Sequence, residues 1–543
     1  MNVDSLIAMY KREKSSSERA NFEDLYQSAA EFCNPKADNI QQTKTKGQRS
    51  DQQRLTDIGI KARRMFTAGM MSHLFPQGQN WLRIVPQNRE LLNSDNVVRA
   101  LTSCSKKFIR YIEDSNFYEE MGQSIDHCAY IGTTALYCES SPRRMLNFRS
   151  HYINQFYFCE NYLGEVDTVI REFKLTARQA MQQFGDNNSL EIKENSTDPK
   201  TNSKEYTFIH VVMPREGFKF DSDVKEEKPI ASYYIDIKAR KLLLESGFDE
   251  MPYAVGRFYK TNFEKYGRSP ALEVFTSLPL INRMEVSRIR GAERVANPPW
   301  LAPNDGSVRR ISNEQGSIIY WNAGNPLSKP EQLRPMDNII VNDQMIEKKE
   351  QEVLDAFYVP LFNPLLNRKN MTAFESQERL NLSLQFLTPA VNRLNKYFVT
   401  PILERAFGIL FRAGAFRELE IDELSEQSLE FDLVGKASIA SRQIELFGTM
   451  TAIQQIAQVG QINPEVFDNI NPDKTARFIQ EVNMCPVDLQ RSEAEVAFIR
   501  DQRLQEQEMM QQRANLQASA DVYAKTAKTP EEGSDAQQMQ MEE

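Results

Sequence analysis

The first 250 residues show two hydrophobic patterns in succession. Apolar residues recur at helical spacing near 22–32, 55–75 and 94–114. Runs rich in β-branched and aromatic residues come next and predict strands at 133–138, 155–159, 165–173, 206–213, 230–238 and 242–244. Because helices precede strands instead of alternating with them, the pattern indicates an α+β unit and not a series of βαβ units.

Turn and capping residues refine this prediction. Asn161 to Gly164 separates two predicted strands and indicates a hairpin loop. Thr176 is placed to cap a short helix, and Gly185 is placed to end it.

The middle of the chain predicts two long helices around a short insert. The first covers 270–295, and Pro279 should kink it or shorten it from the front. The second covers about 338–358, where Ile339, Ile346 and Val353 recur every seven residues. The segment between the two helices is rich in turn residues, so we expect a compact insert there.

Beyond Gly435 the chain again has helical spacing, ending in a Gln-rich helix that runs toward residue 525. The residues after 528 hold five acidic side chains and no basic one, which is typical of a disordered tail.

The charge balance argues against a protein that coats nucleic acid by bulk charge. Lys and Arg number 66 against 75 Asp and Glu, a formal net charge of −9. Binding to a phosphate backbone needs many cations on phosphates, and this chain has a surplus of anions. A protein that surrounds DNA without gripping it remains compatible with this charge.

Known catalytic and targeting patterns are missing from the sequence. There is no Walker A, GxGxxG, HExxH or GxSxG motif, so we expect no enzyme activity and no cofactor. The six cysteines lack a CxxC pair and the four histidines are dispersed, so we expect no metal site. No apolar run is long enough to predict a membrane span or a secretory signal.

Several short segments resemble one family in order and spacing. They are Phe75-Pro-Gln-Gly78, Gly132-Thr-Thr134, Tyr266-Gly-Arg-Ser-Pro-Ala271, Ala296-Asn-Pro-Pro299, Asn370-Met-Thr-Ala373 and Leu387-Thr-Pro389. Together, across roughly 55–435, they resemble the portal proteins, or head-to-tail connectors, of short-tailed double-stranded DNA bacteriophages.

This resemblance implies a portal-type α+β fold with a two-helix stem, a small α/β clip inserted between the stem helices, and a helical crown. The implied parts are an α+β wing at 1–269, stem helix 1 at 270–296, the clip at 297–337, stem helix 2 at 338–359, a tunnel loop at 360–371, a returning wing segment at 372–436, the crown at 437–527 and a disordered acidic tail at 528–543.

The resemblance implies that twelve copies form a ring at one capsid vertex, and that double-stranded DNA is packaged and ejected through this ring. The implied partners are other copies of the chain, DNA in the channel, the terminase large subunit, a tail adaptor, and the scaffold and major capsid proteins, with no membrane. The implied location is the virion, after assembly in the host cytoplasm.

The resemblance also suggests candidate site residues. The channel or tunnel loop would contain Leu365, Leu366, Asn367, Arg368 and Lys369. Contacts between subunits, or a channel lining, would come from stem residues Glu285, Arg288, Arg290, Glu293 and Arg294. A clip docking surface would contain Trp300, Arg309, Arg310 and Trp321.

The alternative is an oligomeric helical virion or scaffold protein that is not a portal. Such a protein would expose a continuous coiled-coil seam, whereas the heptad here lasts for only three positions. This short heptad favours the portal hypothesis.

Overall fold

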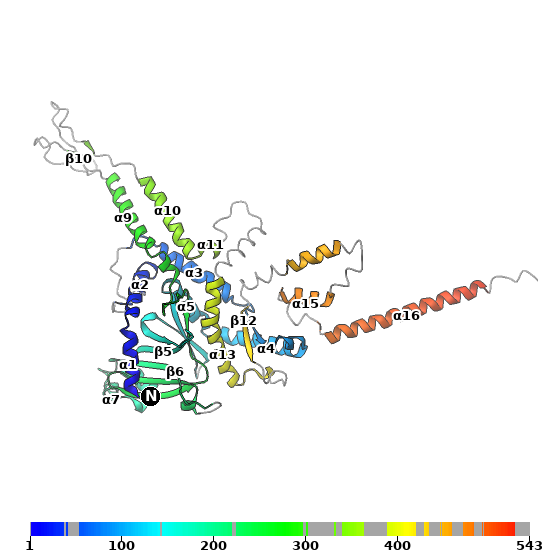
Figure 1. The fold of residues 1–543 in the computed structure, drawn as a ribbon, viewed down its shortest axis with the longest axis horizontal. Helices are drawn as coiled ribbons and strands as arrows, with labels where there is room; N and C mark the ends of the chain where they lie inside the picture. The colour runs from blue at the N-terminus through cyan, green and yellow to red at the C-terminus, as the bar shows by residue number, and fades with distance from the viewer. Residues whose placement is uncertain are drawn as a thin grey trace, which may run out of the picture. The chain divides into compact units, whose positions relative to one another are not determined.

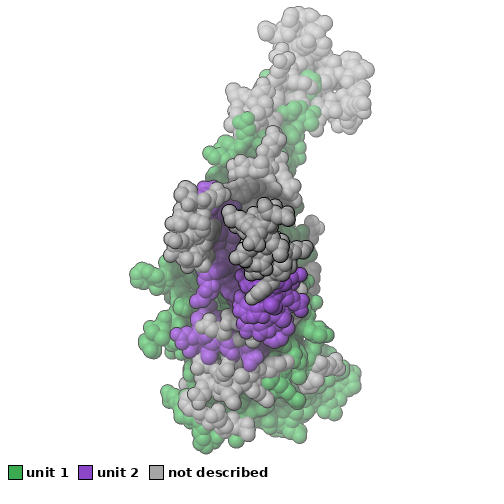
Figure 2. Space-filling view, turned by 90° about the vertical axis from the view of Figure 1, so that its right-hand side faces the viewer, with its two compact units in different colours: residues 1–87, 103–445 green, residues 88–102, 446–543 purple. Residues whose placement is uncertain are grey.

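The computed structural model describes most of the chain and divides into two compact units. The described residues are 2–36, 40–41, 54–141, 144–219, 224–296, 300–301, 331–332, 339–362, 388–419, 428–433, 446, 448–458, 471–482, 491 and 493–526. Unit 1 contains residues 1–87 and 103–445, and unit 2 contains residues 88–102 and 446–543 (Figure 2).

Unit 1 holds all of the described strands and most of the helices (Figure 1). Its helices are α1 (Val3–Lys14), α2 (Ser17–Cys33), α3 (Ile58–Leu74), α5 (Phe117–Tyr130), α6 (Ala177–Phe184), α7 (Leu190–Thr197), α8 (Pro270–Glu273), α9 (Ser277–Ala296), α10 (Ile339–Ala356), α11 (Val359–Phe362), the π-helical turn η7 (Asn395–Val399) and α13 (Thr400–Arg412). Helix α4 (Asp95–Glu113) contributes residues to both units.

The strands form four antiparallel groups. They are β1 (Leu82–Pro86), β2 (Thr133–Ser141), β3 (Arg144–His151), β4 (Phe156–Glu160), β5 (Val166–Thr176), β6 (Glu205–Pro214), β7 (Ile230–Asp236), β8 (Lys241–Phe248), β9 (Tyr253–Arg257), β10 (Trp300–Leu301), β11 (Glu331–Gln332) and β12 (Leu429–Leu433). The sheet orders are β4-β5-β6-β7-β8, β3-β2-β9, β1-β12 and β10-β11. Mixed helices and antiparallel sheets confirm the predicted α+β class.

Alternation along the strands gives the five-stranded sheet two covered faces. Ile209 and Val211 of β6 point to the face that α1 covers with Leu6, Ile7 and Tyr10. Phe208 and Tyr206 point to the opposite face and pack against residues of α6 and α7. The two faces thus belong to two separate hydrophobic clusters.

The hairpin and cap predictions for this sheet are confirmed. Residues 161–164 join β4 to β5, and Thr176 caps α6 in a reciprocal capping box with Gln179. Gly185 ends α6 with a φ of 52°. Helix α7 was missed, because its segment is too polar to show a helical stripe.

The three-stranded sheet forms a second layer that α5 and α13 both contact. Here β9 returns to pair with β2, in a register that places Leu136 opposite Ala254. The pairing of β1 with β12 joins Ile84 to Phe431 across almost 350 residues. This pairing ties the returning segment of the chain to the N-terminal half.

Helices α9 and α10 run side by side and, with β10 and β11, are called the arm below (Figure 1). Pro279 lies in the first turn of α9, so the predicted helix is shortened from the front, and α8 forms a separate turn before it. Trp300 pairs with Gln332 where β10 follows α9. The rest of unit 1's described residues are called the body.

The described part of unit 2 is helical. It contains α15 (Pro472–Val482) and the 34-residue α16 (Glu493–Thr526), which confirms the predicted Gln-rich helix. Arg500 donates two hydrogen bonds, of 2.8 and 2.6 Å, to the Asp473 carboxylate and so joins α16 to α15.

Candidate functional site: the arm and its base

The entrance to the arm is anchored by a fully buried serine. The Ser269 hydroxyl donates to the Tyr130 carbonyl at 2.9 Å and accepts the Leu272 N–H at 3.3 Å. Pro270 occupies the first helical position, where its missing N–H costs nothing. The end of α5 therefore sets where the chain turns toward α9.

Two glycines allow the backbone to pass close by this anchor. Gly132 has a φ of +89°, and a Cβ there would lie 2.3 Å from the Arg268 carbonyl carbon. A Cβ on Gly267 would lie 2.4 Å from the Gly132 oxygen. Gly267 also donates its N–H to the Thr133 hydroxyl at 2.8 Å. Two of the sequence segments that suggested the family thus meet at the base of the arm.

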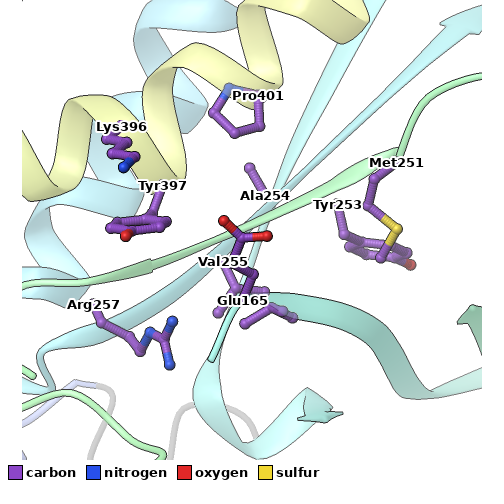
Figure 3. A pocket seen from close by; sticks show the side chains of 10 residues that line it. Glu165, Met251, Tyr253, Ala254, Val255, Arg257, Lys396, Tyr397 and Pro401 are labelled. Carbon is purple, nitrogen blue, oxygen red and sulfur yellow. The ribbon is translucent and has the colours of Figure 1, made fainter. Parts of the chain in front are cut away.

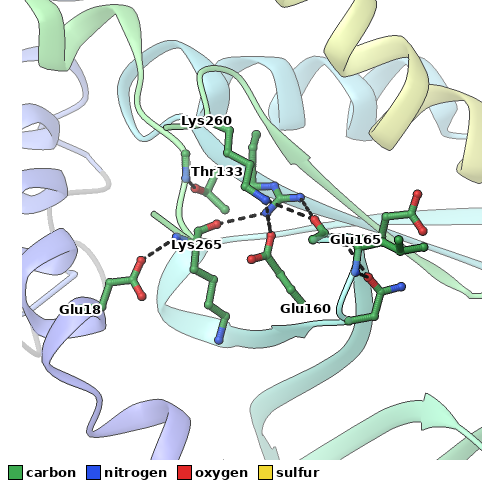
Figure 4. Close-up of polar contacts among 11 residues, drawn as sticks. Glu18, Thr133, Glu160, Glu165, Lys260 and Lys265 are labelled. Carbon is green, nitrogen blue, oxygen red and sulfur yellow. Dashed lines mark hydrogen bonds and ion pairs between the residues drawn. The ribbon is translucent and has the colours of Figure 1, made fainter. Parts of the chain in front are cut away.

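An ion-paired network surrounds the loop between β9 and α8 (Figure 4). Arg257 pairs with Glu160 and also donates to the Gly164 carbonyl at 3.2 Å. Lys260 reaches the same carboxylate at 2.6 Å. Burial alone would raise the pKa of Glu160, but the hydrogen bonds from Lys260 and Arg257 outweigh it and hold that pKa below its usual range. The network fastens the β4–β5 hairpin to the chain that enters the arm.

Within the arm, Arg288 has two acidic neighbours in the same chain. It lies 2.9 Å from the Glu285 carboxylate and 3.8 Å from Asp343 on α10. Glu285 is only 8% exposed. Burial, and then the neighbouring Glu285, raise the pKa of Glu350 on α10. Glu285 lies near Glu350, and Arg288 lies near Asp343. Residue numbers therefore increase along α9 as they decrease along α10, so the two helices are antiparallel.

The outer half of α9 has a different character. Arg290, Glu293 and Arg294 are exposed, and none has an ion-pair partner among the residues that the structure describes. Ile289 and Val295 beside them are 40% and 51% exposed. The five predicted arm residues therefore divide into an inner pair, Glu285 with Arg288, and an outward set of three.

A tight corner follows α10. Tyr358 has a φ of +56°, which is uncommon for a side chain of this size, and its hydroxyl contacts that of Tyr259. Phe362 then packs on Gly69 of α3, where a Cβ would lie 2.1 Å from the ring. The body thus determines the direction in which the chain leaves the arm.

The remaining predicted residues can be placed only in part. Trp300 is half-buried in β10. The predicted tunnel-loop residues 365–369 and the clip residues Arg309, Arg310 and Trp321 lie outside the described residues.

A cavity of about 240 Å³ lies between the β5 end of the hairpin, β9 and α13 (Figure 3). Tyr397 and Pro401 lie on its helical side, with Met251 and Tyr253 across from them. The other lining residues are Glu165, Val166, Ala254, Val255, Arg257 and Lys396. Small-molecule sites usually measure about 300–1,000 Å³, so this cavity is sized for a single side chain.

The described residues contain neither a cluster of metal ligands nor a membrane-spanning helix. Among them, no group of three or more His, Cys, Asp and Glu side chains could hold a metal ion. No helix in the described ranges is both long and apolar enough to cross a membrane.

The model of the family described as bacteriophage head to tail connecting protein matches residues 7–489. The chain belongs to this family. Its match includes the body from residue 7 onward and the whole arm, whereas α16 lies beyond the matched range. The predicted family is therefore confirmed.

Curated members agree with this assignment. The chain is 26% identical over 528 residues to a portal protein of Salmonella phage epsilon15, and the alignment covers 93% of this chain and 92% of that one. It is 23% identical over 523 residues to a probable portal protein of Bordetella phage BPP-1, with 94% and 92% covered.

Sequence reasoning missed several residues that hold the connector's arm in place. The sequence around Tyr358 did not predict its positive φ, because tertiary packing determines that backbone conformation. Arg257 and Glu160 are 97 residues apart, so no spacing rule could pair them. The Gly132 and Gly267 positions did carry a signal, since both lie in segments that resemble the family.

Proposed function

We propose that this connector forms a ring-shaped portal at one capsid vertex, through which double-stranded DNA enters during packaging and leaves during ejection. The observation that supports this most is the family match over residues 7–489, which includes the whole arm. The proposed role is structural, in the virion, with no reaction catalysed by the chain.

The charge of the chain suits a conduit. Each phosphate contact strengthens binding to DNA and would slow its passage, so a channel should carry few free cations. With −9 per chain, twelve copies carry about −108, a field that repels DNA from the bulk surface. A few bases at a constriction could then centre the duplex, and Arg368 with Lys369 are the proposed ones.

The outer half of α9 is proposed to meet neighbouring subunits or the channel. Arg290, Glu293 and Arg294 are exposed beside exposed Ile289 and Val295. Protein interfaces combine an apolar core with a polar, solvent-accessible rim, and this half of α9 offers side chains of both kinds. Glu285 and Arg288 are proposed for the same contacts, and Arg288, whose side chain is 46% exposed, also lies 3.8 Å from Asp343 on α10.

The parts of the portal fold follow as proposals. The body corresponds to the wing, the arm helices to the stem, 297–337 to the clip and 437–527 to the crown. We place a docking surface for the terminase large subunit and later the tail adaptor on the clip, with Trp300, Arg309, Arg310 and Trp321. Scaffold and major capsid proteins would contact the assembled ring during head assembly in the host cytoplasm.

The decisive experiment is the solution mass of the purified protein, with electron images of the same sample. Twelve copies of 62.7 kDa give about 752 kDa, and the images should show an annulus with a central hole. A closed dimer or tetramer that never forms rings, including with scaffold protein present, would contradict the proposal and favour the non-portal virion or scaffold protein.

The channel role of the two bases needs a separate test. The double variant Arg368→Ala with Lys369→Ala should assemble into rings of normal mass but package or retain less DNA. The matched control, Arg240→Ala with Lys241→Ala, changes two adjacent bases at the β7–β8 turn of the body. Equal packaging by both double variants would exclude a channel role for the pair.

A further inference from the structure

The C-terminal end of α10 has a backbone conformation that is unusual for a tyrosine. Tyr358 has a φ of +56°, and its N–H donates to the Asp355 carbonyl at 2.9 Å. A left-handed residue just after a helix is usually glycine, because a side chain there costs free energy. A glycine would end α10 without that cost, so the contacts of the tyrosine side chain have to be considered.

The Tyr358 side chain reaches a residue 99 positions earlier. Its hydroxyl contacts the hydroxyl of Tyr259, at the start of the loop through which the chain enters the arm. Tyr259 is itself fixed by two backbone hydrogen bonds with Arg268, of 3.1 and 2.8 Å. The hydroxyl contact therefore joins the chain's exit from the arm to its entry.

A buried aromatic cluster on α3 packs against both of these connections. The ring of Phe66 is fully buried and lies 5.5 Å from that of Phe258 on the entry side. On the exit side it lies 6.4 Å from the ring of Phe357 and 6.2 Å from that of Phe362. Residues 357–362 are called the corner below. Because Phe357 and Phe362 lie on opposite sides of Tyr358 in the chain, a change in the φ of Tyr358 would move Phe362 relative to Phe66.

Two opposing contributions act on the corner. The left-handed backbone of Tyr358 favours a change to negative φ. The hydroxyl contact with Tyr259 and the packing of Phe362 on Gly69 of α3 favour the conformation observed. Strained residues of this kind persist only where their surroundings hold them in place, and they are concentrated in segments that switch between conformations.

We propose that Tyr259 and Tyr358 form a latch that fastens the exit of the arm to its entry, and that opening the latch releases α11 from α3. With the latch closed, the chain leaves α10 in the one direction observed. With the latch open, Tyr358 relaxes to a negative φ and Phe362 leaves Gly69. This device goes beyond the proposed portal, because it is a property of the single chain.

Hydrogen exchange of the backbone amides of the corner tests the latch in the full-length chain. The N–H of Tyr358 is bonded to Asp355, and that of Leu361 donates to the Tyr358 carbonyl at 3.1 Å, so both report opening. Tyr259→Phe and Tyr358→Phe should each speed this exchange about tenfold, which corresponds to the loss of one hydrogen bond. The amides of α1 in the same samples should exchange at the wild-type rate, which shows that the body remains folded.

Two further variants separate the latch from simple packing of the ring. The double variant Tyr259→Phe with Tyr358→Phe should exchange no faster than either single variant, because both changes remove the same contact. Tyr358→Gly loses the hydroxyl but also removes the strain, so its corner should exchange more slowly than that of Tyr358→Phe. If ring packing alone held the corner, the glycine variant would exchange faster than the phenylalanine variant.

Tyr206→Phe is the matched control. It removes a hydroxyl that accepts a hydrogen bond of 2.6 Å from the Asn195 amide, and it lies on β6 of the same body. Exchange at the corner should be unchanged in this variant.

Three outcomes would overturn the latch. They are wild-type exchange in both single phenylalanine variants, multiplied effects in the double variant, and faster exchange in Tyr358→Gly than in Tyr358→Phe. None of these measurements requires a ring. A chain that never forms rings would therefore contradict the proposed function, while the exchange rates alone would decide the latch.

Discussion

In the body of the connector, charged side chains are buried and paired within the chain. Along the outer half of α9, charged side chains are exposed to solvent. Arg19 of α2 is fully buried, lies 2.6 Å from Glu23, and has the rings of Tyr157 and Tyr266 within 4.7 and 5.2 Å. Arg290 and Arg294 have no such partners among the described residues.

The two regions therefore differ in what completes them. A buried cation without partners is very costly, so the body must satisfy Arg19 before it is stable. An exposed cation is solvated by water, so leaving it unpaired costs the folded chain little free energy. The buried charges of the body are satisfied within a single chain, whereas the charges on the outer half of α9 are solvated.

Substitution of Arg19 should have the largest effect. Arg19→Met keeps the aliphatic stem but leaves Glu23 and the carbonyls of Ile153 and Phe156 without their donor. We expect a loss of about 3–5 kcal/mol in unfolding free energy, measured by denaturant titration. The control Arg290→Met should stay within about 0.5 kcal/mol of wild type. Equal losses in both variants would remove the contrast between body and arm.

Crowding at the base of the arm should give the next largest effect. Gly132→Ala forces a Cβ against the Arg268 backbone at a φ of +89°, so we expect a loss of roughly 2–4 kcal/mol. Gly217→Ala is matched, because its φ is +73° but nothing lies within 4 Å of the added Cβ. That control should lose only about 1 kcal/mol. Thermal unfolding compares the two, and similar losses would show that only the backbone conformation matters.

The body should also be sensitive to acid through a buried histidine. His210 of β6 bonds to Tyr253 and Ser232 at 2.9 Å each, and it is fully buried. Burial, and then the nearby Arg171, lower its pKa to about 3. Below pH 6.5, His210 becomes protonated in the unfolded chain but stays neutral in the folded chain. The free energy of unfolding therefore decreases as the pH falls toward 3.

This loss should amount to about 1.4 kcal/mol per pH unit for His210. His210→Gln cannot titrate, so its stability should fall less steeply between pH 6.5 and 4.5, whatever its stability at pH 7.5. Denaturant midpoints at several pH values measure the two slopes. Parallel curves for wild type and variant would contradict a neutral, buried His210.

The smallest effects on single-chain stability should come from the arm. Arg288→Ala removes contacts to Glu285 and Asp343 and should cost up to about 1 kcal/mol. Arg290→Ala with Arg294→Ala should change stability by less than about 0.5 kcal/mol but weaken oligomer assembly. Sedimentation and denaturant unfolding of the same samples distinguish the two results. Normal assembly of the double variant would show that these arginines do not face a neighbour.

Local pattern was enough to predict much of the fold. Turn chemistry acts over only a few residues, so local features were predictable from the sequence. The structure confirms the hairpin loop at 161–164, the helix cap at Thr176 and the helix end at Gly185. Pro279 shortened α9 for an equally local reason. The short, polar α7 was missed, because it has almost no apolar stripe to detect.

The candidate site was predictable in its location but not in its contacts. The arm helices and their charged residues followed from periodicity, yet nothing in the sequence separated Arg288, which pairs within the chain, from Arg290, which faces solvent. The difference arises because α10 packs against one side of α9 only. The cavity was likewise invisible before the fold was known.

The sequence by itself determined the class of the fold, the two long helices, the family and the acidic balance, because periodicity, turn residues and composition are properties of neighbouring positions. Only the tertiary structure decided which charges are buried and which glycines are required. Those features depend on residues such as Arg257 and Glu160, 97 positions apart, that folding brings into contact. Burial then sets their energies, since the same charge costs little in water and much inside the protein.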